Sequence, residues 1–423
     1  MGYQRPRGTQ DFLPDYLDKW NYVESVWRKI TSRYNFREIV TPMFESTELF
    51  CRTAGETSDI VTKEMYTFDD RGGRSITLRP EGTAPVVRAY FENKMYAEMQ
   101  PVKLFYIMPM FRYERPQAGR FRQHYQYGVE CIGVRNPYID VEVISLFMEF
   151  YSELGVLEPI VWLNSLGCSE CRVEYKKKLV QFLRESEECL CEECKIRLHK
   201  NPLRALDCKN DECRAYLDKA PLLKDNLCPD CSSDFEQVKR LLNLKKINFV
   251  IKPMLVRGLD YYNRTVFEIA AKGVSAKEVI AGGGRYDYLL KEIGGVDSSA
   301  FGAGAGMERI IQTLEMQNVE IPRQNVLRTA VVSISAQANE QAFLLAEALR
   351  AKGLAIELIV DAKKIGKTLA LLDSNKYAYV LIMGEDEMRN RSIVLKNLSM
   401  RTQQIVSLDD LRKIEVAIAE GKS

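Results

Sequence analysis

The sequence predicts an α+β protein with three parts: an antiparallel sheet flanked by helices, a mostly helical insertion, and a C-terminal α/β domain. Two strand-like runs enclose a polar segment near residue 115, as in a β-hairpin with a long loop. Nine of the eleven cysteines gather in a charged, helix-prone stretch between Cys168 and Cys231. After residue 325 strands and helices alternate, a pattern that is typical of α/β domains.

The expected domains are residues 1–325, interrupted by the insertion at about 166–245, and residues 326–423. A chain of 423 residues with 46% apolar content is long enough for two or three cores. The net charge of +2 means that any nucleic-acid surface must be a local patch. No apolar run approaches 18 residues and the N-terminus lacks an apolar signal segment, so we expect a cytoplasmic protein that binds no membrane.

The first elements follow from periodicity. An apolar stripe at steps of three and four, from Leu17 to Tyr34, predicts a helix. The run FREIVTPMFE predicts an extended segment that ends or meets a sheet edge near Pro42. Short strands are expected at 64–68 and 75–78, and a helix after the polar segment 79–83. Polar groups between a strand end and a helix start are well placed to hold a ligand.

The predicted hairpin joins KLFYIMPMF to HYQYGVECIG through a loop that is rich in arginine. Arg112 lies at the root of this loop, where a strand holds it rigidly. An arginine fork donates two parallel hydrogen bonds to a phosphate and stays charged at cellular pH. The hairpin is therefore a candidate phosphate site, and the alternative is a solvated, charge-rich loop.

The remaining elements continue the pattern. A helix is expected at 138–154 and a strand at 159–163, and strands resume after the insertion at 249–251 and at 255–271. GGGRYD at 282–287 is expected to open a helix, and FGAGAG at 301–306 to be a strand that leads into another helix. In the last domain strands are expected at 328–335, 355–360, 377–384 and 392–398, with helices at 341–353 and 364–376, joined by right-handed crossovers.

Three arginines, Arg112, Arg257 and Arg309, come from separate strand ends or helix starts. If they converge, they would suit a polyphosphate, with acids such as Glu81 and Glu130 nearby. The sequence contains no Walker A loop, Rossmann glycine fingerprint or kinase loop. Only two histidines are present, so a Ser-His or His-metal active site is poorly supported.

Five motifs resemble those of the histidyl-tRNA synthetases, a family of class II aminoacyl-tRNA synthetases, and the resemblance covers nearly the whole chain. IVTPMFE at 39–45 resembles class II motif 1, the hairpin resembles motif 2, and AGMER at 305–309 resembles motif 3. LVRGLDYY at 255–262 and GGRYD at 283–287 resemble two peptides specific to the histidine enzymes. The resemblance implies a homodimer that uses ATP and Mg²⁺ to attach L-histidine to tRNA(His) through histidyl-adenylate, with a C-terminal anticodon-binding domain.

The same resemblance implies roles for single residues. Arg112 would bind the ATP α-phosphate, Arg309 the γ-phosphate, and Arg257 would lie between the α-phosphate and the histidine carboxylate, which makes these three the expected catalytic residues. The expected histidine contacts are Glu81, Thr83, Gln126, Glu130, Arg257, Tyr261 and Tyr262. The expected ATP contacts are Arg112, Glu114, Arg120, His124 and Arg309. Arg115 and Gln117 are expected to face the acceptor end of the tRNA.

Two positions depart from the family pattern. His124 stands where a phenylalanine that stacks on adenine is usual, and we expect its ring to stack in the same way. Ala303 stands where phenylalanine is common, and Phe301 is expected to compensate for the lost volume. Neither change removes a charged participant.

The cysteines of the insertion occur in pairs at metal-ligand spacing. Eight ligands would make two structural zinc sites of four thiolates each, or fewer if the segments do not meet, and the alternative is a set of free, partly buried thiols. Many members of the family lack these cysteines, so a metal would brace the insertion, which in the family leans on the tRNA acceptor arm. The candidate ligands are Cys168, Cys171, Cys191, Cys194, Cys208, Cys213, Cys228 and Cys231, with Cys189 extra.

Two other functions use the same fold. A regulatory paralogue of histidine biosynthesis would keep the fold without aminoacylation or an anticodon domain. The intact RGLDYY peptide and the roughly one hundred residues after Asn325 argue against it. A non-catalytic tRNA-sensing domain would have no need of Arg112, Arg257 and Arg309 together.

Overall fold

The structure is a computed structural model that describes residues 2–54, 58, 60–115, 120–185, 187–208, 210–272, 279–322, 328–362 and 364–420. The chain forms two compact units, Met1–Pro322 and Arg323–Ser423. The boundary predicted after residue 325 falls in 323–327, outside the described residues. Within the described part of the chain, no helix is both long enough and apolar enough to cross a membrane.

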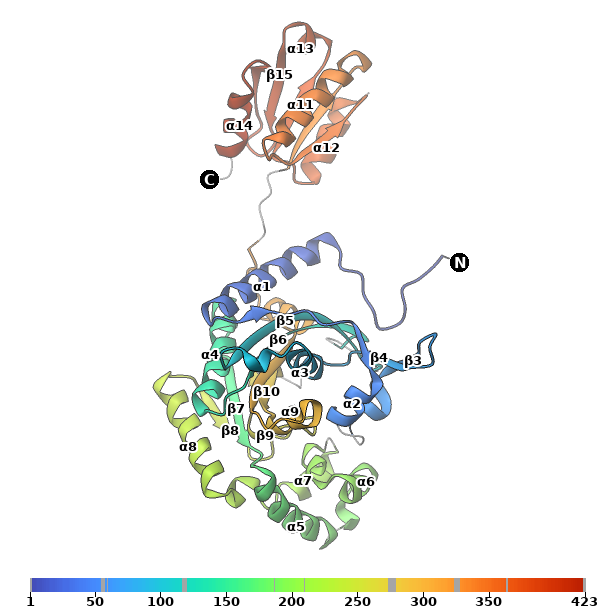
Figure 1. Ribbon diagram of the computed structural model, residues 1–423. Helices are drawn as coiled ribbons and strands as arrows, with labels where there is room; N and C mark the ends of the chain where they lie inside the picture. The colour runs from blue at the N-terminus through green and yellow to red at the C-terminus, as the bar shows by residue number, and fades with distance from the viewer. Residues whose placement is uncertain are drawn as a thin grey trace. The chain divides into compact units, whose positions relative to one another are not determined.

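An eight-stranded, mostly antiparallel sheet forms the centre of the first unit (Figure 1). The predicted hairpin is confirmed as its longest pair, in register from Val102 opposite Ile132 to Phe111 opposite Gln123. Among the described strands of this sheet, only the two edge pairs, β1 with β5 and β7 with β8, are parallel. In spatial order the strands are β1 (Arg37–Glu38), β5 (Val102–Phe111), β6 (Gln123–Ile132), β11 (Ala300–Gly306), β10 (Val279–Arg285), β9 (Asn263–Ala270), β7 (Ile160–Ser165) and β8 (Phe249–Ile251).

Each face of this sheet has its own apolar core. On one face Trp27 of α1 (Pro14–Arg33) and Phe147 of α4 (Pro137–Glu153) are fully buried, together with side chains of α8 (Pro229–Leu244) and α10 (Met307–Met316). The other face packs against α3 (Thr83–Glu92) and α9 (Asp287–Gly294). The predicted stripe of α1 is confirmed, since its Trp20, Val23, Trp27 and Ile30 are buried.

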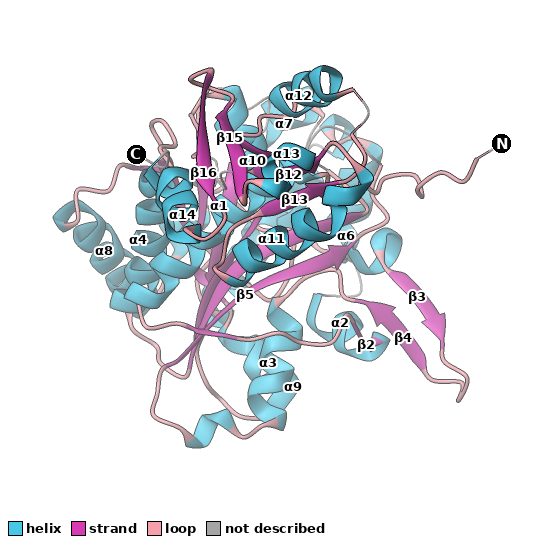
Figure 2. Cartoon of the chain, turned by 90° about the horizontal axis from the view of Figure 1, so that it is seen from above, coloured by secondary structure: helices cyan, strands magenta, loops and turns pink. Residues whose placement is uncertain are grey.

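A three-stranded sheet lies beside the main one and contains the two short strands predicted near 64–68 and 75–78 (Figure 2). The chain enters it from β1 through Pro42, which belongs to no strand, so the predicted interruption there is confirmed. Its elements are β2 (Phe44–Ser46), β3 (Tyr66–Asp69) and β4 (Ser75–Leu78), with α2 (Thr47–Ala54) and the π-helical turn η1 (Ile60–Glu64) between β2 and β3 and the 3₁₀ turn η2 (Met95–Ala97) after α3.

The predicted helical insertion is confirmed between the parallel strands β7 and β8. Its fully buried leucines, such as Leu179 and Leu183 on α5, join the core beneath α3 and α9. The part of the insertion from α5 to η5 therefore packs against the sheet face of α3 and α9, whereas α8 packs in the core on the opposite face. Its elements are α5 (Ser169–Glu185), η3 (Glu187–Cys189), α6 (Glu192–Lys200), η4 (Pro202–Asp207), α7 (Asp211–Leu217), η5 (Leu223–Asn226) and α8.

Two predicted boundaries are wrong. The run 255–271 is a strand only from Asn263 onward, because the Asn164 side-chain amide donates to the carbonyls of Pro253 and Leu255 and holds that segment in a loop. The triple glycine before Arg285 lies inside β10, and α9 begins only at Asp287. These glycines form a strand because β9 and β11 pair with β10 on both sides.

The second unit is a five-stranded sheet with helices, which confirms the predicted α/β domain. β12 pairs in parallel with β13 and β14, as crossover helices require, whereas β15 and β16 add an antiparallel edge that the alternation did not predict. Its elements are β12 (Thr329–Ser333), η6 (Ala336–Ala338), α11 (Asn339–Ala351), β13 (Ile356–Ile359), α12 (Ile365–Ser374), β14 (Tyr379–Met383), α13 (Glu385–Arg389), β15 (Ser392–Asn397), β16 (Thr402–Ser407) and α14 (Leu411–Glu420).

Candidate active site

The polar site is built on one face of β6. Successive side chains of a strand point to opposite faces, so His124, Gln126 and Glu130 share the face that packs against α3. The residues between them, such as Tyr127 and Val129, enter the opposite core. One strand therefore carries three of the predicted ligands in a row.

Glycines in the neighbouring strands leave room for two charged side chains. Gly302 of β11 lies opposite Glu130, and a methyl group at Gly302 would overlap the Glu130 carboxylate. Gly282 of β10 lies beneath Arg257, and a Cβ there would come within 2.5 Å of Arg257 Nη1. The glycines of β10 and β11 therefore have two roles. They pair with the neighbouring strands, and because they lack a Cβ they let Glu130 and Arg257 lie close to the sheet.

The carboxylate of Glu130 is buried and accepts hydrogen bonds from three hydroxyl groups. Thr83 Oγ1 donates to Oε1 at 2.8 Å, Tyr106 donates to the same oxygen at 3.4 Å, and the Tyr286 hydroxyl donates to Oε2. Burial raises the pKa of Glu130 to about 8. The hydrogen bonds from the three hydroxyl groups act in the opposite direction and lower the pKa, but burial is the larger effect. The group is thus poised to exchange a proton near neutral pH.

Glu81 occupies the N-terminus of α3. Its carboxylate accepts from the backbone N–H groups of Thr83 at 2.7 Å and Ala84 at 2.9 Å, in the manner of a helix cap. Burial raises the pKa of Glu81, whereas these N–H groups and the charge of Arg112 favour its ionised form. Glu81 and Glu130 are thus joined through Thr83, which bonds to both.

Arg257 lies in the loop before β9, where it forms an ion pair with Glu268. Its guanidinium carbon lies 5.7 Å from the centre of the Tyr262 ring, within reach of a cation–π interaction. Its Nε is buried and has no hydrogen-bond partner among the described residues. A buried donor without a partner is costly, so this atom is suited to an acceptor on a ligand. Tyr261 packs on Tyr262 with ring centres 4.7 Å apart.

A pocket of ≈ 180 Å³ gathers the residues predicted to bind ATP. Arg309, at the start of α10, donates to the carbonyl of Val279 at 2.7 Å, and Arg112 donates to that of Pro80 at 2.7 Å. Burial and the charge of the nearby Arg120 lower the pKa of Arg309, a sign of positive charge that an anion would stabilise. The pocket is lined by Arg112, Glu114, Arg120, Phe121, His124, Gln126, Gly306, Glu308 and Arg309.

His124 is uncharged in this pocket. Burial, with the charge of Arg112 as a smaller cause, lowers the pKa of His124 to about 3. Glu114 pairs with Arg120 at 3.0 Å and lies 3.9 Å from Arg112, so one acid orients two of the arginines. Of the two residues predicted to face tRNA, Arg115 is exposed and Gln117 lies outside the described residues.

Sequence reasoning missed four residues of the site. Tyr106 and Tyr286 donate to Glu130, Glu268 pairs with Arg257, and the buried Glu308 accepts from the Tyr125 N–H at 3.0 Å. Tyr286 and Glu308 stand inside the GGRYD and AGMER motifs, which could have pointed to them. Tyr106 and Glu268 lie on strands with no polar motif, and only the strand register reveals that they face the site.

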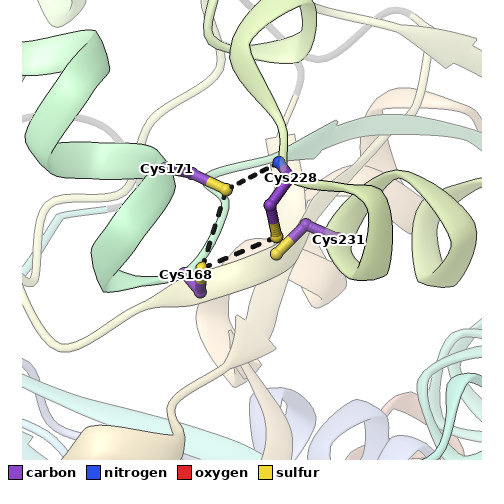
Figure 3. Close-up of side chains that lie close together, drawn as sticks. All are labelled: Cys168, Cys171, Cys228 and Cys231. Atoms are coloured by element: carbon purple, nitrogen blue, oxygen red, sulfur yellow. Dashed lines mark hydrogen bonds between the residues drawn. The ribbon is translucent and has the colours of Figure 1, made fainter.

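The eight predicted cysteine ligands form two clusters, each with all four sulfurs within 4.8 Å of one another. The neck cluster joins the two ends of the insertion and consists of Cys168, Cys171, Cys228 and Cys231 (Figure 3). The tip cluster lies within the insertion and consists of Cys191, Cys194, Cys208 and Cys213. Cys189 is exposed and belongs to neither. The spacings alone did not show which cysteine pairs meet. In the structure the first pair along the chain meets the last pair, and the second pair meets the third.

The sulfur spacing fits a tetrahedral metal. Zinc–sulfur bonds of about 2.3 Å in a tetrahedron separate the sulfurs by about 3.8 Å. In the neck cluster the Cys168 sulfur lies 3.6 Å from that of Cys171 and 3.9 Å from that of Cys228. In the tip cluster Cys191 and Cys208 are 3.6 Å apart. Both clusters therefore have the donor set and the dimensions of a structural zinc site.

Comparison with known proteins agrees with this site and fold. Residues 8–310 match the protein family described as histidyl-tRNA synthetase, and residues 328–416 match the family described as anticodon binding domain. The histidine–tRNA ligase of Halothermothrix orenii is 46% identical over 97% of this chain and 98% of its own length. That of Anoxybacillus flavithermus is also 46% identical, over 96% of this chain and 97% of its own.

The solved structures give the same result. The apo histidyl-tRNA synthetase of S. aureus is 35% identical, has a TM-score of 0.83, and is matched over 99% of its length by 98% of this chain. A protein from Bacillus halodurans described as an ATP phosphoribosyltransferase regulatory subunit/histidyl-tRNA synthetase is only 20% identical, with a TM-score of 0.66, and shares the fold alone. With the histidyl-tRNA synthetase family matched over residues 8–310 and relatives matched over nearly their full length, the chain belongs to the histidyl-tRNA synthetase family.

Proposed function

We propose that this chain is a histidine–tRNA ligase, the activity for which its close relatives are named. Histidine attacks the α-phosphate of ATP to give histidyl-adenylate and pyrophosphate, and the terminal ribose of tRNA(His) then takes the histidyl group. The observation that carries this proposal is the single face of β6, where Gln126 links the arginine pocket to the buried Glu130. A histidine pocket and an ATP pocket would then share one wall.

The histidine pocket would surround Glu130. The carboxylate would accept from one nitrogen of the imidazole, and Tyr262 would contact the other side, with Tyr261 packed behind it. Glu81, Thr83 and Gln126 would hold the α-amino group. A site that is built to satisfy both ring nitrogens rejects isosteric side chains strongly, because its buried polar groups would otherwise remain unpaired. The raised pKa of Glu130 supports this role, because the carboxyl group can then share a proton with the imidazole near neutral pH. The imidazole would replace only some of the three hydroxyl groups that bond to Glu130.

The arginine pocket would hold ATP. Arg112 would bind the α-phosphate and Arg309 the γ-phosphate, while Glu114 and Arg120 orient the nucleotide. Mg²⁺ bound together with ATP would supply positive charge that neutralises the charge developing on the phosphates during transfer. The neutral ring of His124 would stack on adenine, which its low pKa supports because a charged imidazolium would be repelled by Arg112. An ATP affinity that is unchanged in His124→Ala would argue against stacking.

Arg257 would join the two pockets and carry the chemistry of the first step. Its unpaired Nε would donate to an oxygen shared between the histidine carboxylate and the α-phosphate. The fixed positive charge would stabilise the pentacovalent phosphorus as it forms. Glu268 would keep the guanidinium in place without a substrate.

The tRNA would contact both units. Arg115 is exposed and follows Glu114, which lines the arginine pocket, and it would reach the acceptor end together with Gln117. The second unit would bind the anticodon, as the family match over 328–416 supports. Both contacts are needed for the second step, and neither is needed for adenylate formation.

The enzyme would act as a homodimer. Val40, Met43 and Phe44 expose 71%, 54% and 53% of their surface in the segment that resembles motif 1. Three large apolar side chains exposed so close together are typical of an interaction site. A second copy of this chain is the proposed partner.

The two cysteine clusters would hold structural zinc, which brings four thiolates from two segments into one tetrahedron and takes no part in the reaction. Metal analysis of purified protein that finds less than about one zinc per chain would contradict this.

Exchange of pyrophosphate with ATP tests the proposed function. Histidine should drive this exchange in the absence of tRNA, and other amino acids should not. A regulatory paralogue or a tRNA-sensing domain would show no exchange, so its absence from well-folded protein would overturn the ligase assignment.

A further inference from the structure

The neck cluster touches the segment that carries two predicted histidine ligands. Cys168 and Cys171 stand at the start of α5, and Arg172 follows directly after Cys171. The Arg172 guanidinium donates to the backbone carbonyl of Tyr262 through Nη2 and to that of Leu166 at 3.2 Å through Nε. The first turn of α5 therefore fixes the backbone of Tyr262.

A second link runs through Arg264, two residues after Tyr262. Its Nη1 lies 3.1 Å from the sulfur of Cys231 and 3.0 Å from the carboxylate of Asp234. Its backbone N–H donates to the carbonyl of Gly167 at 2.9 Å, next to Cys168. Both ends of the insertion thus hold this one residue.

Arg264 needs such support because its backbone is strained. Its φ of 49° lies in the left-handed region, which is unfavourable for a residue other than glycine. A conformation of this kind persists only where its surroundings impose it. The neighbouring Asn263 exchanges hydrogen bonds with Asp287 at 3.0 and 3.1 Å, so the strain is held at the root of β9.

We propose that a zinc ion in the neck cluster positions the segment Tyr261–Arg264 and thereby sets the affinity for histidine. Arg172 and Arg264 are the positioning residues that connect the metal site to the pocket. This inference rests on the proposed function, because it concerns the histidine pocket of that same ligase.

The charges fit a metal at this place. Four thiolates around Zn²⁺ carry a net charge of −2, which the guanidinium of Arg264 meets directly at Cys231. The Cys228 N–H donates to the Cys171 sulfur at 3.0 Å, a hydrogen bond that stabilises a metal-bound thiolate (Figure 3). Cys228 is also the N-cap of α8, where the helix dipole favours negative charge. Without the metal, no bond would hold the four sulfurs in place, and the contact between Cys231 and Arg264 would weaken.

The tip cluster is the internal control. Among the described residues, the contacts of its sulfurs stay within the insertion, at the carbonyls of Ala205 and Asn210. It has the same donors and the same spacing as the neck cluster. Although η4, between its cysteines, lines a pocket with Arg257 and Tyr262, no hydrogen bond of the tip sulfurs within the described part of the chain reaches a side chain that holds the segment Tyr261–Arg264.

The experiment compares two double variants of the full chain, Cys228→Ser/Cys231→Ser in the neck and Cys208→Ser/Cys213→Ser in the tip. Zinc per chain, by elemental analysis, should fall from about two to about one in each. In pyrophosphate exchange, the neck variant should raise the histidine KM about tenfold with the ATP KM nearly unchanged, and the tip variant should change neither. Hydrogen exchange should rise at Tyr261–Arg264 in the neck variant alone.

Each other outcome overturns the proposal. If the parent protein contains no zinc, neither cluster is a zinc site and the proposal is wrong. A neck variant that loses one zinc and keeps the histidine KM disproves the coupling, as do equal increases in both variants. Absence of exchange in the parent protein would instead refute the ligase, whatever its zinc content.

A variant that keeps the metal tests the link even if the neck variant fails to fold. Arg172→Ala should retain about two zinc ions and still raise the histidine KM, because it removes the bonds to the Tyr262 and Leu166 carbonyls but no metal ligand. The matched control is Arg184→Ala, an exposed arginine on the same helix, which should behave as the parent. Equal histidine KM values in the two variants would disprove the positioning role.

Discussion

At the scale of residues, the site depends on charged groups whose neighbours come from distant parts of the chain. Arg257 and Glu130 could be predicted because each stands in a recognisable motif. The hydroxyl groups of Tyr106 and Tyr286 could not be assigned to Glu130, because they come from β5 and from the turn before α9, and sequence order does not show which tyrosines face a buried acid. Motifs thus identify charges, whereas the fold decides how each charge is compensated.

Arg257→Ala should separate catalysis from binding. Because the guanidinium is proposed to act on the transition state, kcat for pyrophosphate exchange should fall by about a hundredfold or more. Histidine affinity, measured by calorimetry, should fall much less. Arg257→Lys keeps the charge but loses the planar fork, and it should give an intermediate rate. Equal losses in rate and affinity would mean that Arg257 binds substrate and transition state alike.

Glu130→Gln should change how stability depends on pH. The native pKa of Glu130 is about 8, above its ordinary 4.5, so between these values the folded protein keeps a proton that the unfolded chain releases. Its carboxyl group therefore makes the protein less stable as pH rises through this window. The amide does not titrate, so the variant should gain free energy of unfolding relative to the parent, on the order of a few kcal/mol, between pH 5 and pH 8.5. Urea unfolding at both pH values measures this, and a pH-independent difference would show that Glu130 is ionised throughout.

At the scale of elements, β10 and β11 explain why glycine runs and arginines occur together in this sequence. Alternation predicts which side chains of β6 share a face, but it does not show that Gly302 and Gly282 make room for Glu130 and Arg257. The prediction of a strand before Asn263 was wrong because the conformation there, too, depends on a contact that the sequence pattern does not show. The pattern of that run is strand-like, and only Asn164, from another strand, diverts its carbonyl groups.

Gly302→Ala tests this use of glycine. The added methyl group would overlap the Glu130 carboxylate and displace it from the pocket, so the histidine KM in pyrophosphate exchange should rise about tenfold or more. Gly304→Ala, on the same face of the same strand, would meet only ordinary contacts, of which the nearest is 3.5 Å from the Tyr106 hydroxyl. Its effect should be much smaller, and similar losses in both variants would point to a general disturbance of β11.

At the scale of the whole molecule, the two units were predictable because the sequence pattern changes where the chain passes from one core to the next. The first unit contains the complete candidate site for adenylate formation, from Glu81 to Arg309. The second has its own core between its sheet and helices. Association between copies of the chain was predicted only from the family resemblance. The first unit nevertheless contains a series of contacts through which such association would affect the ATP pocket.

This series of contacts passes through Arg79, which is almost fully buried. Its Nη1 donates to the carbonyls of Thr41 at 2.6 Å and Pro42 at 3.1 Å, inside the segment that exposes Val40 and Phe44. The next residue, Pro80, accepts the hydrogen bond from Arg112 Nε at 2.7 Å. A partner that orders residues 40–44 would therefore also hold Arg112 in the ATP pocket.

Val40→Asp/Phe44→Asp should accordingly convert a dimer to monomers and impair catalysis together. Two charges placed in an apolar interface remain unpaired, so association should weaken by several kcal/mol, visible as a halved mass in light scattering. Pyrophosphate exchange should fall because Arg112 loses its support, with the ATP KM rising more than the histidine KM. Leu244→Asp, an exposed apolar residue at the end of α8, is the control and should leave mass and exchange unchanged. A fully active monomer would show that residues 40–44 do not transmit association to Arg112, and a parent protein that is itself monomeric would disprove the homodimer.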